Sequence, residues 1–404
     1  MGASRGYDVL VVGAGLVGLA TARALHRRHS PAVCVLEAEE RVAAHQSGHN
    51  SGVIHSGLYY RPGSEKARLC RAGRAALLEY CRAKGIPART TGKLVVATRP
   101  AELGALAELE RRGRANGLAG IERLGPEGLR AHEPHVAGIE GLWVPEAGVV
   151  DYAAVARSLA EDVRAAGGEV RLGEGAGRIR RDGAGFVVET PRGELRARTL
   201  VNCAGAQADR VARRAGVDPG LAIVPFRGEF KRLDPSRADL VRTMVYPVPD
   251  PALPFLGVHV TRRVSGDIEV GPNAVLALHR FGYRLRDVSL ADTAEMLRYP
   301  GFWRMLRANA RHGAGELYRS LAPRAFARAV RRLVPAIEAR DLSPLGSGVR
   351  AQAVDPDGSL VDDFRFVAGP GSLHVLCAPS PAATACLAIG EAIAERARGL
   401  AGSG

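Results

Sequence analysis

The chain has 404 residues, of which 46% are hydrophobic, and its formal net charge is +14 at pH 7. This composition is that of an ordinary soluble globular protein, and the length is sufficient for two or three packed cores. The six cysteines are scattered without a Cys-x-x-Cys pair, which argues against a disulfide or zinc framework and indicates reduced thiols in a cytoplasmic setting.

The chain is predicted to begin with a strand, a helix and a second strand. We expect these elements at Tyr7–Val12, Leu16–His29 and Ala32–Glu37. The segment "YDVLVVGAGLVGLATARAL" is almost long enough to span a membrane, but Asp8 and three central glycines interrupt it. The sequence therefore predicts a strand that leads into a helix, and no transmembrane segment.

The turn between the first strand and the helix carries the pattern "GAGLVG". Gly13 allows the tight turn, Gly15 lets the backbone approach a pyrophosphate, and Gly18 lets helix and strand pack closely. The helix N-terminus presents free amides and a partial positive charge to the phosphates. Glu37 ends the next strand, nineteen residues beyond Gly18, and can accept hydrogen bonds from an adenosine ribose. Together these features predict a bound dinucleotide.

A polar, glycine-rich loop, "HQSGHNSGVIHSGLYYRPGS", follows the second strand. His45 and His49 stand four residues apart, as two metal ligands on one helix face would. Gly48 and Gly52 argue against a stable helix there, and no acidic third ligand is expected nearby, so the sequence predicts no metal site. The backbone amides and short polar side chains of the loop instead suit a phosphate and the edge of a ring.

Helices and strands alternate through the following segments. A helix near Glu65–Lys84 precedes alternating patterns that continue to about Val150, and "DYAAVARSLAEDVRAAGGEVRL" is typical of a helix and a strand. "GFVVET" and "LVNCAG" are expected to be further strands. From about Pro225 to Pro272 the chain is rich in proline and β-type residues, and helices are expected over roughly Ser289–Val334. The last segment is a strand, a turn and a closing helix.

This order of elements predicts an α/β fold whose Rossmann-like dinucleotide domain is assembled from non-contiguous pieces. Its pieces are residues 1–88, 146–222 and 345–404. Residues 89–145 and 223–344 are expected to form a second, α+β domain, which contains a β-sheet and binds the substrate.

The closing helix is expected to begin directly after "CAP". Ser380 suits the N-cap and Pro381 the first helical position. Ala382, Ala383 and Thr384 would then carry the unpaired backbone amides of an ordinary capped helix.

Much of the positive charge lies between Arg298 and Arg332, where nine arginines accompany one acidic residue, Glu316. Apolar residues such as Phe302 and Trp303 interleave with them. Two interpretations stay open: helices packed on the protein with a solvated face, or a basic amphipathic surface on an anionic membrane. A positive field would also steer an anionic substrate toward a cleft. No aromatic-interleaved RNA motif is present, and we predict no nucleic-acid partner.

Several stretches of the sequence resemble one family of flavoenzymes. They are "VVGAGLVGLATARAL", "HQSGHNSGVIHSGLYYRPGSEKARLC", "VPFRGEF", "YPVPDP", "PFLGVHVT", "GPNAVLAL", "GVRAQAVDPDGSLVDDF" and "APSPAAT". These stretches are similar to the L-2-hydroxyglutarate dehydrogenase/oxidase family, which has the FAD-dependent D-amino-acid-oxidase-like fold. The similarity runs from about residue 7 to 395. "GHNSGVIHSGLYY" and "YPVPDP…PFLGVH" are its specific parts, whereas "GAGLVG" and "LVNCAGAQAD" indicate only the FAD superfamily.

The resemblance implies FAD as the cofactor and the oxidation of L-2-hydroxyglutarate, a small dicarboxylate, to 2-oxoglutarate. In this family the electrons pass to oxygen, a dye or a membrane quinone pool. The resemblance also puts Ala176 where a strand over the adenine usually carries valine, and Cys377 where an asparagine is expected. The residues expected at the FAD site are Gly13, Gly15, Leu16, Val17, Gly18, Glu37, Ala38, His45, Gly48, His49, Asn50, Ser51, Gly52, Val53, Ala176, Ala204, Gly205, Pro381, Ala382, Ala383 and Thr384.

Oxidation of an α-hydroxy acid requires a hydride acceptor, an acceptor for the hydroxyl proton and cationic or hydrogen-bonding anchors for the carboxylates. His55 is our first candidate for the proton acceptor, because its loop should pass by the flavin ring, and His259 is the second. Arg350 in "GVRAQ" is the candidate anchor for a carboxylate, since a guanidinium presents paired donors. The residues expected to bind the remaining carboxylate or the hydroxyl are Tyr60, Tyr246 and Thr261.

The sequence leaves two substrate classes open. The resemblance favours L-2-hydroxyglutarate, whereas the fold alone would also suit another small hydroxy acid, an amino acid or glycerol-3-phosphate. We expect a cytoplasmic enzyme, and a peripheral contact with the inner face of the membrane if the basic block binds lipid or the enzyme hands electrons to a quinone.

Overall fold

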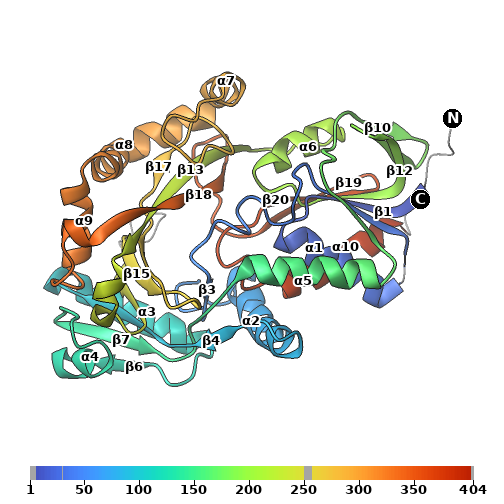
Figure 1. The fold of residues 1–404 in the computed structure, drawn as a ribbon. Helices are drawn as coiled ribbons and strands as arrows, with labels where there is room; N and C mark the ends of the chain where they lie inside the picture. The colour runs from blue at the N-terminus through green and yellow to red at the C-terminus, as the bar shows by residue number, and fades with distance from the viewer. Residues whose placement is uncertain (1–5, 30, 250–256, 402–404) are drawn as a thin grey trace.

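The computed structural model describes residues 6–29, 31–249 and 257–401 of the chain. It contains two layered regions, each built on its own large sheet and lying side by side in Figure 1. Parts of the stretches "YPVPDP" and "PFLGVHVT" fall in residues 250–256, outside the described residues. None of the helices in the described part of the chain is long and apolar enough to cross a membrane.

The first region is built on a mainly parallel sheet. At its centre β1 pairs in parallel with β2 on one side and with β12 on the other. This order places the turn after β1 between two other strand ends, at the carboxyl edge of the sheet where nucleotides bind in such folds. In spatial order its strands are β10 (Ile179–Asp182), β11 (Gly185–Thr190), β12 (Gly193–Asn202), β1 (Gly6–Val12), β2 (Val33–Leu36) and β9 (Glu169–Arg171), with β20 (Ser372–Cys377) paired to β12 and to β19 (Arg365–Gly369).

Helices pack against this sheet and bury an apolar core with it. α1 packs on both α5 and α10, and α10 also packs on α2. The helix contacts are close, because a Cβ at Gly390 of α10 would lie 2.6 Å from the carbonyl carbon of Ala20 in α1. The helices of the region are α1 (Leu16–His29), α2 (Glu65–Ala83), α5 (Tyr152–Ala165), α6 (Ala208–Arg214) and α10 (Cys386–Ala401).

The second region is built on a larger, mainly antiparallel sheet. Its strand order is β17 (Val275–Leu276), β13 (Ala222–Leu233), β16 (Ile268–Gly271), β15 (His259–Arg262), β14 (Met244–Pro247), β5 (Lys93–Ala97), β7 (Glu140–Val144) and β6 (Glu122–Leu124), with β18 (Leu342–Val354) paired to β13. Its helices are α3 (Leu103–Ala115), α4 (Pro126–His132), α7 (Leu290–Arg298), α8 (Pro300–Leu321) and α9 (Pro323–Arg331). A separate small sheet has the strand order β3 (Val53–Ile54), β8 (Gly148–Val150) and β4 (Ala88–Thr90).

A long antiparallel pair, β13 with β18, runs between the two regions (Figure 1). Its register sets Ala222 opposite Val354 at one end and Leu233 opposite Leu342 at the other. Within it, Arg350 stands opposite Phe226. The pair therefore carries the candidate carboxylate anchor on a rigid strand rather than on a loop.

The predicted α/β fold class is confirmed, and the helical block expected at 289–334 is present as α7, α8 and α9. The predicted start of the closing helix is wrong, because α10 begins at Cys386 and the residues from Ser380 to Ala385 form turns. There the amide of Ala382 donates to Pro379 O (2.9 Å), so Ser380 is not an N-cap. Ala176 lies in the loop between β9 and β10 rather than in a strand.

Candidate active site

A large cavity of about 1410 Å³ opens between the two regions. Drug-sized ligands usually occupy pockets of about 300–1,000 Å³, so this cavity has room for a dinucleotide together with a small acid. It brings together most of the residues that the sequence had singled out. These are Gly13, Gly15, Leu16, Val17, Glu37, Ala38, His45, His49, Asn50, Ser51, Val53, His55, Tyr60, Ala176, Ala204, Gly205, Tyr246, His259, Arg350, Pro381, Ala382 and Ala383.

Five of the predicted residues do not border the cavity. Gly18, Gly48 and Gly52 instead allow the close backbone packing around it. A Cβ at Gly18, for example, would lie 2.0 Å from the carbonyl oxygen of Gly13 and could not be accommodated. Thr261 is buried next to Tyr246 in the sheet, and Thr384 is turned inward. Any contribution of Thr261 and Thr384 to the site therefore passes through neighbouring residues.

The turn after β1 forms a backbone cradle at one end of the cavity. Gly13 has φ 106°, a conformation that side chains rarely adopt, and a Cβ there would lie 2.5 Å from Cys203 O. The amide of Leu16, at the start of α1, donates to Ser47 Oγ (2.9 Å). Ser47 was not predicted, since it reaches the helix from the next loop, 31 residues away in the chain.

Glu37 places its carboxylate beside this turn. The side chain is buried, and its two oxygens accept hydrogen bonds from the amides of Ala14 (2.8 Å) and Glu39 (3.1 Å). These bonds fix the carboxylate at the cavity wall, where its remaining lone pairs face the cavity. An acceptor held in this way suits the hydroxyls of a ribose.

His45 and His49 are held by a segment of the second region. His45 Nε2 lies 2.9 Å from Glu39 Oε1 and Nδ1 lies 3.0 Å from the Tyr283 hydroxyl, while its ring stacks on Phe281 at 3.9 Å. His49 stacks on Tyr283 at 4.3 Å. Glu39, which follows the second strand, is the acidic side chain that reaches His45. Across the described residues no three His, Cys, Asp or Glu side chains gather as a metal site.

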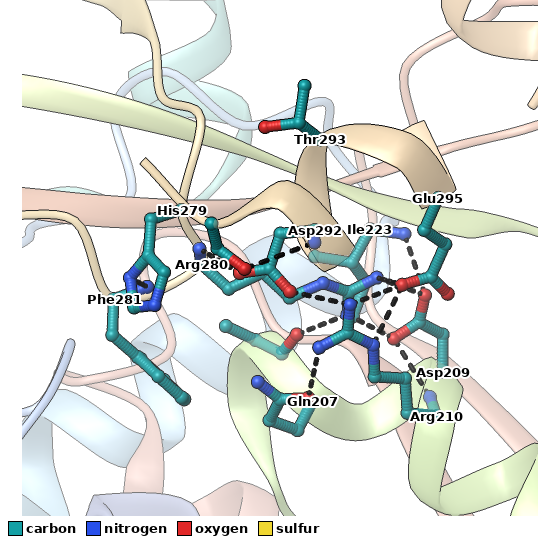
Figure 2. Close-up of polar contacts among 12 residues, drawn as sticks. Gln207, Asp209, Arg210, Ile223, His279, Arg280, Phe281, Asp292, Thr293 and Glu295 are labelled. Carbon is teal, nitrogen blue, oxygen red and sulfur yellow. Dashed lines mark hydrogen bonds and ion pairs between the residues drawn. The ribbon is translucent and has the colours of Figure 1, made fainter. Parts of the chain in front are cut away.

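Residues 277–289, which we call the covering segment, carry Phe281 and Tyr283. A buried ion pair, Arg280 with Asp209, ties the covering segment to α6 (Figure 2). Arg280 Nη2 lies 3.0 Å from Asp209 Oδ2, and both side chains are almost fully buried. Burial alone would raise the pKa of Asp209, but the hydrogen bonds and charge of Arg280 outweigh it and hold the pKa below its ordinary value. Glu295 of α7 joins the cluster through Arg280 and Arg210.

His55 lies against the turn before α10. Its amide donates to Thr384 Oγ1 (3.0 Å), and its Nε2 lies 3.0 Å from Ser380 Oγ. Part of the ring faces the cavity, although protein surrounds it on the other sides. Burial, reinforced by the positive charges of Lys93 and Lys66, lowers the pKa of His55 to about 3. The imidazole is therefore neutral at pH 7.

His259 faces the same cavity from β15. Its Nδ1 donates to Gly257 O (2.9 Å), which leaves the lone pair on Nε2, and its ring stacks on Tyr246 at 3.9 Å. Burial and the nearby charges of Arg350 and Lys93 lower the pKa of His259 to about 3. Burial also lowers the pKa of Arg350, which borders the cavity from β18.

Comparison with known proteins agrees with this arrangement. A family model described as "FAD dependent oxidoreductase" matches residues 8–396. The L-2-hydroxyglutarate dehydrogenase of Salmonella houtenae is 46% identical over 396 residues, which cover 98% of this chain and 94% of that protein. The mitochondrial L-2-hydroxyglutarate dehydrogenase of Homo sapiens is 42% identical over 407 residues, covering 96% of this chain and 88% of that protein.

The chain belongs to the L-2-hydroxyglutarate dehydrogenase family of FAD-dependent oxidoreductases. Its fold is also similar to that of the FAD-bound L-α-glycerophosphate oxidase of Mycoplasma pneumoniae, with a TM-score of 0.80 and 23% identity over 98% of this chain and 95% of that one. Glycine oxidase of Geobacillus kaustophilus matches with a TM-score of 0.71 and 20% identity, over 98% and 95% of the two chains. The predicted family and the FAD cofactor are thus confirmed.

The residues of this family member fit FAD. The glycine turn after β1 leaves backbone space for a pyrophosphate, and the fixed Glu37 carboxylate suits a ribose. At the other end of the cavity, the amides of Ala383 and Thr384 have no acceptor among the described residues, although the Ala382 amide is paired. Two free amides beside a buried cavity suit a ring oxygen that gains negative charge.

Sequence reasoning missed several cavity residues in this family member. Lys66, Arg112, Gln207, Arg210, Phe281 and Ser380 border the cavity, and Lys93 lies directly behind its wall. Their spacing in the chain gives no signal, because they come from α2, α3, the turn before α6, α6 itself, the covering segment, the turn before α10 and β5. Cys377, the departure noted above, is buried at the end of β20 and does not border the cavity, and burial raises its pKa to about 11.

Proposed function

We propose that this enzyme oxidises L-2-hydroxyglutarate to 2-oxoglutarate. The observation that carries the proposal is the cavity that joins an FAD-type cradle to two neutral histidines and a guanidinium, His55, His259 and Arg350. Relatives that are 41–46% identical and carry the name L-2-hydroxyglutarate dehydrogenase support the substrate. FAD, when bound, supplies the acceptor for the hydride that leaves C2 of the substrate.

Arg350 is proposed to bind the carboxylate next to the reacting carbon. The guanidinium stands on the long β13–β18 pair, so its position is fixed by the sheet rather than by a loop. Paired N–H donors match the two oxygens of a carboxylate and orient the substrate. Tyr60 and Tyr246 border the same space, and burial raises the pKa of both hydroxyls, so they remain protonated donors to an anion.

His55 is proposed to take the proton of the substrate hydroxyl at Nε2. Its neutral state at pH 7 follows from burial, and Ser380 Oγ lies 3.0 Å from that nitrogen. The hydrogen bond from the His55 amide to Thr384 Oγ1 holds His55 against the segment with the free amides. This position favours His55 over His259 as the base. Nearby cations stabilise the alkoxide that forms as the proton leaves, and general-base assistance of this kind is worth about 10²–10⁴ in rate.

The proposal is tested by anaerobic titration of the FAD-loaded enzyme with L-2-hydroxyglutarate, followed by the visible flavin absorbance. We expect the absorbance to bleach with the L isomer and to persist with the D isomer and with L-lactate. Bleaching by glycerol-3-phosphate or an amino acid, without a response to L-2-hydroxyglutarate, would assign the enzyme to the second substrate class.

A membrane quinone is proposed as the acceptor of the electrons, and the enzyme is proposed to reach it by docking on the cytoplasmic surface of the membrane. The observation that supports it is a set of apolar side chains on α7 and α8 and the turn before them that remain exposed although both helices are packed on the protein. Leu290 is 84% exposed, Tyr318 62% and Trp303 52%, and exposed arginines, among them Arg307 and Arg311, stand on the same helix as Trp303. Such a surface matches an anionic bilayer.

A further inference from the structure

Lys93 is a buried cation beside the proposed substrate site. It is the first residue of β5 and only 1% exposed. Its ammonium lies 4.3 Å from the ring centre of Tyr59 and 4.9 Å from that of Tyr246, and 3.3 Å from the Tyr59 hydroxyl. Both tyrosines border the cavity, so Lys93 reaches the cavity wall through them.

No carboxylate of the described residues forms an ion pair with Lys93. The other lysine near the cavity, Lys66, does have a partner, since its ammonium lies 2.8 Å from Asp362 Oδ1. Taking an ammonium out of water without an anion is costly, and aromatic faces recover only part of the cost. Burial accordingly lowers the pKa of Lys93 to about 7. An anion that enters the cavity would therefore stabilise the charged form of Lys93.

A dicarboxylate brings two negative charges, and Arg350 accounts for one of them. The Lys93 ammonium lies over the Tyr246 ring, on which His259 stacks, and Arg350 lines the same cavity as both rings. Both cations lower the pKa of His259. Tyr59 stands between the Lys93 ammonium and the cavity, and its hydroxyl can pass a hydrogen bond to an oxygen there.

We propose that Lys93 is the positioning residue that makes the enzyme select dicarboxylates, by holding the Tyr59 hydroxyl and supplying the positive charge that complements the second carboxylate. This inference rests on the proposed substrate, and it adds a residue that the sequence pattern did not reveal. A five-carbon acid that lacks the second carboxylate would leave the Lys93 charge uncompensated.

The proposal predicts a pH dependence with a definite sign. The groups that face Lys93 do not titrate near neutral pH, because burial raises the pKa of Tyr59, Tyr246 and Cys70 and lowers that of His55 and His259. Below pH 7 Lys93 is charged and the diacid binds well. Above pH 7 binding must take up a proton, so the affinity falls by up to about tenfold per pH unit.

The experiment compares L-2-hydroxyglutarate with L-2-hydroxypentanoate, which has the same reacting end and no second carboxylate. For Lys93→Met we expect kcat/KM for the diacid to fall about 10- to 100-fold while that for the monoacid is unchanged, since a hydrogen bond to a charged group is lost only with the diacid. The Kd of 2-oxoglutarate, measured from the perturbed flavin spectrum, should rise by the same factor and lose its dependence on pH above 7. Lys93→Arg should restore the diacid preference and extend it to higher pH.

Lys231→Met is the matched control. Lys231 belongs to the same sheet and its ammonium lies 5.2 Å from the Phe326 ring centre, but it does not border the cavity, so both substrates should be unaffected. An equal loss with both acids in Lys93→Met, without rescue by arginine, would reduce Lys93 to a structural residue. If Lys93→Met does not fold, Tyr59→Phe provides the test, and an unchanged ratio of diacid to monoacid would overturn the proposal. Failure of the wild-type flavin to bleach with L-2-hydroxyglutarate would instead overturn the proposed substrate.

Discussion

Two histidines, His55 and His259, face one cavity. Their pKa values are similar, but the groups that contact them differ. Both are held neutral by burial, with a pKa of about 3. His259 is fixed by a backbone carbonyl and stacked on Tyr246, so its ring is built into the wall of the substrate region. His55 is fixed instead to the turn that offers free amides to the cofactor. The contacts therefore place His259 in the cavity wall and His55 against the turn that we propose to face the cofactor.

Replacement of His55 tests that distinction. We expect His55→Ala to slow anaerobic flavin reduction by L-2-hydroxyglutarate by about 10²–10⁴-fold, because the proton of the hydroxyl loses its acceptor. FAD should stay bound, since the glycine turn and Glu37 are untouched, and His259→Asn should mainly raise KM. Stopped-flow absorbance measures the reduction rate, with His132→Ala as a control at a histidine stacked on Trp143 outside the cavity. Near-normal reduction in His55→Ala together with a collapse in His259→Asn would transfer the role to His259.

At the scale of elements, contacts between distant segments determine the shape of the site. The ion pair of Arg280 with Asp209 of α6 is one of the contacts that hold the covering segment against the loop of His45 and His49 (Figure 2). The hydroxyl of Ser347 in β18 also donates to the Tyr283 carbonyl (2.5 Å). A buried pair of this kind adds little net stability when intact, but removal of Arg280 leaves the buried Asp209 carboxylate with the more distant Arg213, 3.5 Å away, as its cation.

Arg280→Met is therefore expected to lower the free energy of unfolding by about 3–5 kcal/mol. Because the covering segment would loosen, the Kd of FAD should rise together with this loss of stability. Denaturant unfolding and FAD titration measure the two quantities. Arg280→Met with Asp209→Asn should recover part of the stability, as the buried charge is gone, and exposed Arg298→Met on α7 is the control. Loss of stability with unchanged FAD affinity would show that the covering segment does not bear on the cofactor.

These contacts also show which parts of the site the sequence could predict. The glycine turn, Glu37 and the 45–64 loop were predictable, because local spacing and a strand–helix–strand context carry the signal. Lys93, Arg280 and Phe281 were not, since their roles arise from pairing over long sequence separations, such as 71 residues between Asp209 and Arg280. The start of the closing helix was misplaced for a similar reason. Thr384 is bonded to the hydroxyl of Tyr152 and the amide of His55, and these tertiary bonds outweigh the local capping preference of Ser380. The domain boundaries stay a prediction.

At the scale of the whole molecule, the charge of +14 is unevenly distributed. α8 and α9, which carry many of the arginines, lie along one edge of the molecule in Figure 1. The interpretation as helices packed on the protein is supported, and the interpretation as a membrane-binding surface stays a prediction. Phe302, Met305 and Phe326 are buried against the protein, whereas Trp303, Tyr318 and Leu321 are more than half exposed. The helices are therefore packed, and an apolar strip remains on their outer surface.

This surface predicts a salt-dependent affinity for anionic membranes. We expect the enzyme to sediment with phosphatidylglycerol vesicles at low ionic strength, to release as salt shortens the range of the charges, and to ignore phosphatidylcholine. Arg307→Gln with Arg311→Gln should weaken binding about 10- to 30-fold, since each arginine near the surface contributes about 1 kcal/mol. Activity with a soluble dye should not change.

The matched control replaces two exposed arginines on α2, Arg68→Gln with Arg82→Gln, which remove the same charge from another part of the molecule. Equal weakening in both double variants would attribute binding to net charge alone and not to the strip. The apolar part has its own readout, because Trp303 fluorescence should shift to the blue when vesicles bind, as an exposed indole enters the interface. Vesicle binding without that shift would show that the apolar strip has no role in docking. Full-strength binding by the double variant Trp303→Ser, Leu321→Ser would lead to the same conclusion.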